Sequence, residues 1–264
     1  MGILDYDFMV NAFAASGIVA IVAGIVGVYL VARGQTFAGH ALSHVGFAGA
    51  TAAGLIGASP LYGTIALTLA AGIGMGALGE RLSARDVAVG IVLALALGFG
   101  LLFLHYYTSF ATQATALLFG NVLAVSPTTL IALVVMAAIA VCGLALISRP
   151  LVFATLQPEL AEAKGVPLRL VGVLFLVIVA LTVSACVQIV GVLLVFTLLV
   201  GPAAAAERWT TRLGTAIALA AGLSLAEAWL GLVIAFYTDW PVSFCITVLS
   251  AAVYFAAIAL PGRR

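Results

Sequence analysis

The sequence predicts an all-α bundle of helices that crosses a membrane many times. Of its 264 residues, 65% are hydrophobic and only 7% are charged, and the mean hydropathy is +1.32. A soluble domain carries roughly a quarter charged residues, so no soluble core could hide this much apolar surface. We therefore expect one transmembrane domain over residues 1–264, and the net charge of +1 gives no indication of nucleic-acid binding.

The apolar segments define the predicted spans, because a helix needs about 20 apolar residues to cross a bilayer. Nine candidate spans result, at 9–31, 40–58, 61–79, 87–105, 128–148, 170–188, 189–206, 213–236 and 242–260. The weakest division lies within 170–206, where a turn near Gln188–Gly191 would form a hairpin. Eight spans remain possible if one segment is re-entrant. The run Ala114–Ala124 is too short to span and is expected to form a re-entrant or surface helix.

The distribution of charge predicts the orientation. If the amino end lies outside, all ten basic residues fall on the cytoplasmic side, as the positive-inside rule requires. They are Arg33, Arg81, Arg85, Arg149, Lys164, Arg169, Arg208, Arg212, Arg263 and Arg264. Three acids and an aromatic belt then fall outside: Asp5, Asp7, Asp239, Tyr6, Tyr62, Tyr106, Tyr107, Tyr237 and Trp240. We expect a multi-pass protein of the bacterial inner membrane, with its carboxyl end in the cytoplasm.

One polar loop, about 148–169, is longer than the others and lies on the predicted cytoplasmic side. Its centre favours a short helix because Pro158 suits a first helical turn and Gly165 a stop. The helix would comprise Pro158, Glu159, Leu160, Ala161, Glu162, Ala163, Lys164 and Gly165. It could dock into a motor protein, or it could be a solvated connector.

The chain is not predicted to be an enzyme that hydrolyses ATP. A phosphate-binding P-loop needs a lysine after glycine and before serine or threonine. The only lysine, Lys164, is followed by Gly165. If ATP drives transport, a second protein must hydrolyse it.

Polar groups inside the predicted spans are candidate functional residues, because they are costly in lipid. His40 and His44 are spaced i, i+4, which places both imidazoles on one helix face where they could share a metal ion. Ser43 could orient an imidazole or a metal-bound water. Glu227 is the one carboxylate well inside an apolar segment, and it could complete a His-His-carboxylate set.

Structural alternatives exist for each of these residues. A histidine in a membrane can bond the backbone of a neighbouring helix, and Glu227 could be a protonated acid that packs between helices. His105, beside two tyrosines, is expected at the membrane interface. Asp239 could attract cations at the outer mouth of a pathway, or it could cap a turn.

Seven segments, in order along nearly the whole chain, carry a family resemblance. The first, Arg33–Gly49, resembles the second-span signature of the zinc/manganese-type ABC importer permeases, in which the usual reading is Gly-Asp-Ala-Leu-Ser-His-Ala-x-x-Pro-Gly. The others are Arg85–Ile91, Leu118–Ser126, Glu159–Val166, Val187–Val195, Gly201–Ala205 and Asp239–Ser243.

The resemblance implies the membrane permease of a metal importer, with the fold of metal-chelate ABC importers. It implies a homodimer that receives metal from an extracytoplasmic binding protein and is driven by two copies of an ATPase subunit. Residues 158–165 would be the coupling helix, and His40 and His44 would lie in the metal path. No cofactor would be bound permanently, since the divalent metal (Zn or Mn) is the cargo.

Two residues depart from the signature. His40 stands where the family usually has aspartate, and Ala48 where it has proline. Imidazole suits zinc and iron, whereas carboxylate and water suit manganese. The sequence therefore favours zinc over manganese as the cargo.

The sequence supports three other functions less well than this one. An ion-coupled secondary transporter would need buried acids, and Glu227 is the one offered. An intramembrane metalloenzyme would need a motif such as His-Glu-x-x-His, whereas the pair here reads His-Ala-Leu-Ser-His. A passive channel would not require the long loop.

Overall fold

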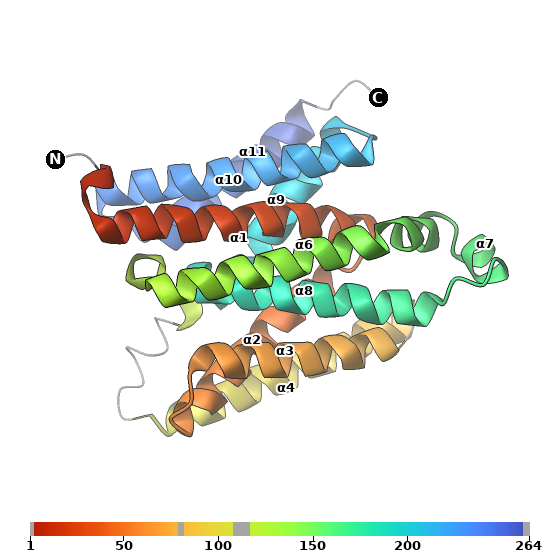
Figure 1. Cartoon of the computed structure of the whole chain (residues 1–264), viewed down its shortest axis with the longest axis horizontal. Coiled ribbons are helices and arrows are strands. Elements are labelled where there is room, and N and C mark those ends of the chain that lie inside the picture. The colour runs from red at the N-terminus through yellow and green to blue at the C-terminus, as the bar shows by residue number, and fades with distance from the viewer. Residues whose placement is uncertain (1–2, 79–81, 108–116, 261–264) are drawn as a thin grey trace.

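A computed structural model describes residues 3–78, 82–107 and 117–260, and in these ranges the protein is helical with no β-strand (Figure 1). Each of the nine predicted spans corresponds to one long helix. The long helices are α1 (Asp7–Ala32), α2 (Thr36–Leu55), α3 (Pro60–Ala77), α4 (Leu82–His105), α6 (Pro127–Leu156), α8 (Leu168–Val190), α9 (Val192–Trp209), α10 (Leu213–Thr238) and α11 (Val242–Ala259). Three short helices accompany them: η1 (Ile3–Asp5), η2 (Val122–Ala124) and α7 (Pro158–Ala163). The predicted all-α fold is confirmed.

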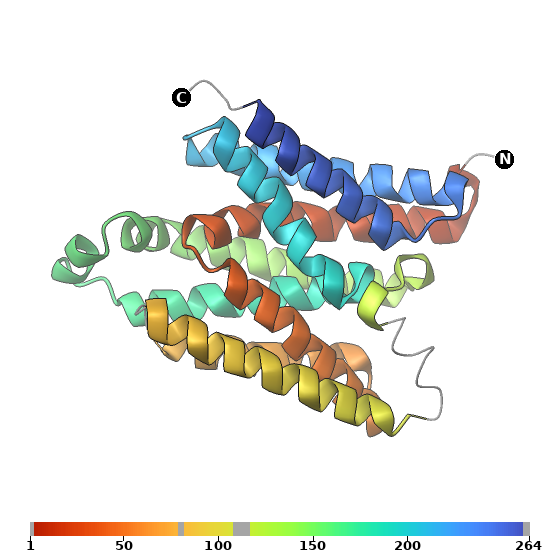
Figure 2. The same ribbon diagram turned by 180° about the vertical axis from the view of Figure 1, so that it is seen from behind.

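Within the described residues, seven of these helices are long and apolar enough to cross a membrane by themselves. They are α1, α3, α4 from Asp86, α6, α8, α10 and α11. The other two long helices, α2 and α9, run obliquely to the rest of the bundle (Figure 2). α2 carries two histidines and four glycines, which lower its hydropathy, and most of its residues are buried. It is therefore shielded by neighbouring helices.

The helices pack as two groups joined by α6 and α8 (Figure 1). One group contains α2, α3 and α4, and the other contains α1, α9, α10 and α11. α8 contacts α3 on one side and α1 and α6 on the other, while α2 also contacts α9. The α2–α9 contact therefore joins the two groups directly.

α2 and α3 approach each other closely because glycines meet where the two helices cross. A Cβ atom added to Gly49 would overlap the Gly63 carbonyl oxygen and lie 2.7 Å from its carbonyl carbon, and a Cβ on Gly63 would overlap the Gly49 oxygen. Without a hydrophobic drive between helices in lipid, such backbone contact is a main source of association.

The predicted turn between the sixth and seventh spans is confirmed at Gly191, which has φ 78°. It packs on Gly120, φ 76°, so that a Cβ on either glycine would overlap backbone atoms of the other segment. Residues 117–119 and η2 form short helical turns here, as expected of the apolar run 114–124, whose first three residues lie outside the described part. α9 then diverges from α8, so the two helices do not form a closely packed hairpin (Figure 2).

The structure changes the boundaries of the predicted loop 148–169. α6 continues through Pro150 to Leu156, so only Gln157 separates it from α7. This extension is stable because Leu151 and Ala154 are buried and the Arg33 side chain donates a 3.0 Å hydrogen bond to Thr155 Oγ1. The short helix itself is confirmed, beginning at Pro158 and followed by Gly165 at φ 79°.

The connections at the two ends of the bundle differ in charge. The end that carries α7, opposite the amino end in Figure 1, holds the α1–α2 and α9–α10 connections and the loop around α7. The basic residues at this end are Arg33, Arg85 in the first turn of α4, Arg149, Lys164, Arg169, Arg208 and Arg212. Three further predicted ones, Arg81, Arg263 and Arg264, lie outside the described residues. The opposite end holds Asp5, Asp7 and Asp239 with the predicted aromatic residues. Which end faces the cytoplasm stays a prediction.

Candidate functional site

His40 and His44 lie side by side on α2, as their spacing predicts. Their ring centroids are 4.8 Å apart and the ring planes meet at 86°. His44 is 6% exposed and His40 is half-buried. The Nδ1 atom of each ring is buried, and neither has a hydrogen-bond partner among the described residues. Two imidazoles therefore retain unused nitrogen atoms at one place in the bundle.

The spacing of the rings is compatible with a shared metal ion. Imidazole nitrogens bind zinc at about 2.0–2.1 Å in tetrahedral geometry, which places the two ring centroids about 5 Å apart. The 86° between the ring planes is also compatible with a shared ion, because tetrahedral coordination fixes the angle between the two metal–nitrogen bonds and not the angle between the rings.

The aromatic ring of Phe196 on α9 closes one side of this pair. Its centroid lies 5.3 Å from that of His40, with the planes at 74°. Nothing in the sequence singles out Phe196, because an apolar residue in an apolar span carries no pairing signal. The structure thus places the histidines where the two groups of helices meet.

Ser43 is fully buried, but its hydroxyl donates to the His40 carbonyl oxygen at 2.7 Å. Its proton is therefore used within the backbone of α2. The predicted role in orienting an imidazole or a metal-bound water has no contact to support it in this conformation.

Buried hydrogen bonds hold α2 against its neighbours. The Thr64 hydroxyl of α3 donates to the Gly46 carbonyl of α2 at 3.3 Å, and α3 is itself joined to α8 by the 2.7 Å hydrogen bond between Thr68 and Ser184. At the far end of α2, the Tyr107 hydroxyl donates to the Thr51 carbonyl at 2.7 Å, and burial raises the pKa of this phenol. These contacts, which the sequence reading missed, restrict the position of the helix that carries both histidines.

Glu227 lies in a different seam, formed by α9, α10 and α11. It is 2% exposed, and neither carboxylate oxygen has a hydrogen bond of standard geometry to a described residue, although Ser250 is close enough to interact. Ser250 packs on Gly201 of α9. Gly201 is five residues after Phe196, so the two lie about 140° apart around the axis of α9. The Glu227 seam and the histidine pair therefore contact different faces of α9. Among the described residues no group of three His, Cys, Asp or Glu side chains could hold a metal ion. Within one chain, the structure does not bring Glu227 to the histidine pair.

This seam also contains a backbone carbonyl that Pro202 leaves free. Proline has no N–H, so the carbonyl four residues earlier, at Leu198, loses its helical donor. The Ser224 hydroxyl of α10 lies 3.4 Å from that oxygen, and the Ser250 hydroxyl of α11 lies 3.4 Å from the Thr197 carbonyl. Glu227 is thus surrounded by groups that join three helices.

The two remaining predicted residues lie at the end of the bundle away from α7. Asp239 ends α10 with a left-handed φ of 59°, and its N–H donates to the Ala235 carbonyl. Asp239 thus caps the end of α10, which is one of the two roles predicted for it. The other role, attraction of cations, stays a prediction. His105 is exposed and packs edge-to-face on Tyr106, as expected of an interfacial residue.

The chain is similar to known membrane transport proteins over nearly its full length. The model of the ABC 3 transport family matches residues 5–261. The "Manganese transport system membrane protein MntC" of Halalkalibacterium halodurans is 30% identical over 263 residues, covering 99% of this chain and 90% of that protein. The "Probable iron transport system membrane protein" of Haemophilus influenzae is also 30% identical, covering 99% and 96%.

A solved structure has the same fold over nearly the full length. It is PsaBC from Streptococcus pneumoniae in complex with Fab, with a TM-score of 0.86 and 27% sequence identity. The match covers 97% of this chain and 93% of that one.

Proposed function

The chain belongs to the ABC 3 transport family, and on that premise we propose that it is the membrane permease of an ATP-driven importer of divalent transition metal ions. ATP hydrolysis belongs to a separate subunit, since the sequence has no P-loop. Relatives named for manganese and iron transport support a metal cargo.

The observation that carries the proposal is the histidine pair on α2. A divalent ion that enters a helical bundle loses part of its hydration shell, and imidazole nitrogens can replace some of those ligands. His40 and His44 offer two such nitrogens without a full coordination cage. Coordination by few ligands stabilises the ion in transit and still lets it leave.

The preference among metals follows from the donor set. Two imidazoles favour zinc over manganese, because manganese binds better to carboxylate and water oxygens. The names of the relatives instead favour manganese or iron. We propose zinc on the chemistry of His40, which replaces the carboxylate that the family signature usually has at this position.

The working assembly that we propose contains two copies of this chain and two ATPase subunits. The end with the basic residues faces the cytoplasm, where α7 docks on the ATPase. An extracytoplasmic binding protein delivers the metal at the opposite end, which carries Asp239. Closure of the ATPase subunits then moves α7 and opens the bundle inward.

The double substitution His40→Ala, His44→Ala tests the role of the pair. In reconstituted vesicles with the ATPase and binding protein, we expect uptake of zinc to fall to the level of empty vesicles. His105→Ala is the matched control, because that histidine is exposed at the end of α4. Unchanged uptake by the double variant would refute coordination by this pair.

The preference among metals needs a second measurement. ATPase activity of the complete complex is recorded with zinc, manganese, iron and nickel delivered by the binding protein. We expect zinc to stimulate hydrolysis more than manganese in the native chain and His40→Asp to reverse that order. Stronger stimulation by manganese in the native chain would contradict the proposed preference.

The ion-coupled secondary transporter is the alternative, with buried Glu227 as its candidate coupling residue. Purification of this chain together with an ATPase, and uptake that stops without ATP, would exclude it.

A further inference from the structure

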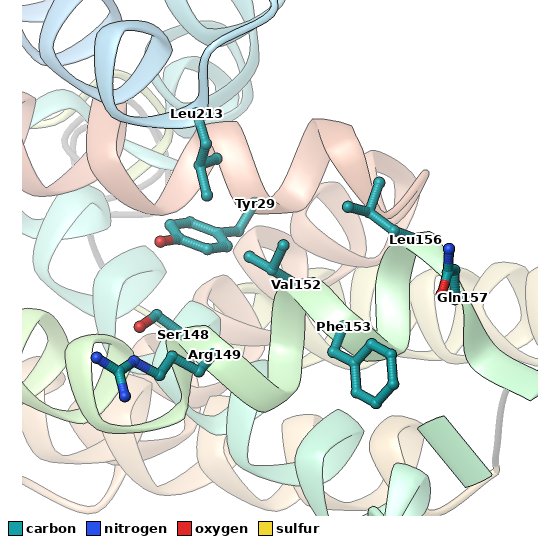
Figure 3. A pocket seen from close by; sticks show the side chains of 8 residues that line it. All are labelled: Tyr29, Ser148, Arg149, Val152, Phe153, Leu156, Gln157 and Leu213. Carbon is teal, nitrogen blue, oxygen red and sulfur yellow. The ribbon is translucent and has the colours of Figure 1, made fainter. Parts of the chain in front are cut away.

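A groove at the α7 end of the bundle is not explained by metal transport. It consists of two adjoining cavities of about 580 Å³ and 390 Å³. Both cavities are lined by Tyr29 of α1, Val152 and Leu156 of α6, and Leu213 at the start of α10. The groove therefore runs between α1, the extended end of α6 and the beginning of α10 (Figure 3).

The larger cavity combines one cation and several hydrogen-bonding groups with an apolar wall. Arg149 is exposed and makes no ion pair with any described residue. In Figure 3 the hydroxyls of Tyr29 and Ser148 lie on the same side of the groove as the Arg149 guanidinium. Phe153 and Leu156 supply apolar surface further along. A ligand that fits must carry negative charge at one end and hydrocarbon at the other.

The position of Arg149 along α6 matches the depth of a lipid headgroup. The outward face of α6 exposes large apolar side chains from Ile131, which is 66% exposed, to Leu146, which is 83% exposed. Eighteen residues separate Ile131 from Arg149, which is about 27 Å of helix at 1.5 Å per residue. The hydrocarbon core of a bilayer is about 30 Å thick. An ion at Arg149 would therefore lie at the membrane surface, continuous with a face that contacts acyl chains.

The other charges around the groove favour the larger cavity for the headgroup. Arg33, near the smaller cavity, already donates to the lining residue Thr155 at 3.0 Å. Arg212 caps α10 directly before the lining residue Leu213 and is exposed. The one carboxylate that lines the groove, Glu207, lies in the smaller cavity. A phosphate would be attracted toward Arg149 and repelled from Glu207.

We propose that this groove binds an anionic phospholipid, with its phosphate at Arg149 and the Tyr29 and Ser148 hydroxyls and its acyl chains along α6. Basic pockets between membrane helices on the cytoplasmic side suit such headgroups. Only Gln157 separates α6 from α7. A bound lipid would therefore stabilise the end of α6 to which α7 is attached. This effect would not depend on which metal the protein transports.

The test measures lipid binding by the full chain, purified in detergent and stripped of lipid. Native mass spectrometry is used to titrate phosphatidylglycerol, phosphatidylethanolamine with the same acyl chains, and inorganic phosphate as competitor. Phosphatidylglycerol should bind at least fivefold more tightly than phosphatidylethanolamine. Arg149→Gln should lose about fivefold of that affinity, the value of one basic contact at a membrane surface, and Arg149→Lys should retain most of it.

Arg169→Gln is the matched control, because Arg169 is exposed at the same end of the bundle and does not line the groove. Equal losses in Arg149→Gln and Arg169→Gln would show non-specific attraction and overturn the site, as would equal affinity for the two lipids. Displacement by millimolar phosphate would identify a soluble anion and overturn the lipid assignment. Binding by the isolated chain that disappears in the complex with the ATPase would assign the groove to that subunit and also overturn the proposal.

Discussion

Replacing Gly49 by alanine tests whether backbone contact between α2 and α3 holds the histidine helix in place. The added Cβ would overlap the Gly63 carbonyl oxygen and lie 2.7 Å from its carbonyl carbon, where ordinary van der Waals contact begins at 3.4 Å. The helices must therefore separate by at least about 0.7 Å at the crossing. Overpacking of this kind costs about 1–3 kcal/mol.

The expected readout is thermal unfolding of the purified protein in detergent. For a chain of this size about 1 kcal/mol shifts Tm by roughly 2–4 °C, so Gly49→Ala should lower Tm by about 2–12 °C. Because His44 lies only five residues before Gly49 on the same helix, metal uptake should fall as well.

Gly74→Ala is the matched control for this prediction. Gly74 lies on α3, and a Cβ added there meets no atom of the described part of the chain within 4 Å. Alanine in a helix interior is about 0.5–1 kcal/mol more favourable than glycine, so this variant should be neutral or stabilised. A Tm for Gly49→Ala within 1 °C of the native value, or an equal loss in Gly74→Ala, would refute the argument.

Three further predictions follow from the same structure. Glu227→Gln should keep Tm within about 2 °C of the native value, because a neutral amide can be buried in this seam. Glu227→Lys should destabilise the protein by about 3–5 kcal/mol, because it buries a charge without a partner. Equal shifts in Tm for the two variants would contradict this. Gly120→Ala should unfold at a lower temperature than Gly165→Ala. Both glycines have φ near 80°, but of the two only Gly120 packs against another backbone segment. Equal Tm values for the two variants would show that the Gly120–Gly191 contact does not stabilise the fold. Leu160, 46% exposed on α7, should contact the ATPase subunit: Leu160→Arg should reduce co-purification at least tenfold and Glu162→Gln should not, and retained co-purification of both would argue against docking through α7.

The number and type of the helices could be predicted from the sequence because lipid imposes a simple rule. Every span must be a helix of about 20 apolar residues, so apolar length alone located all nine long helices. The break at Gly191 and the start of α7 at Pro158 were also predictable, since glycine at positive φ and proline at the first helical turn are local requirements. The end of α6 was not, because Pro150 indicates a stop that burial of Leu151 overrides.

The sequence by itself determined the membrane domain, the segregation of basic residues and the pairing of His40 with His44, because each depends on composition or on spacing along one helix. Only the tertiary structure decided what faces that pair. Phe196 packs against one side of the pair, and the Ser43 hydroxyl donates to the His40 carbonyl within α2. Glu227 lies on the other side of α9, in a different seam. The reason is that contacts between helices depend on how each is rotated and tilted against its neighbours. In a chain this apolar, hydrophobic periodicity gives no direction to that rotation, so close contacts of glycines and buried hydroxyls set it instead.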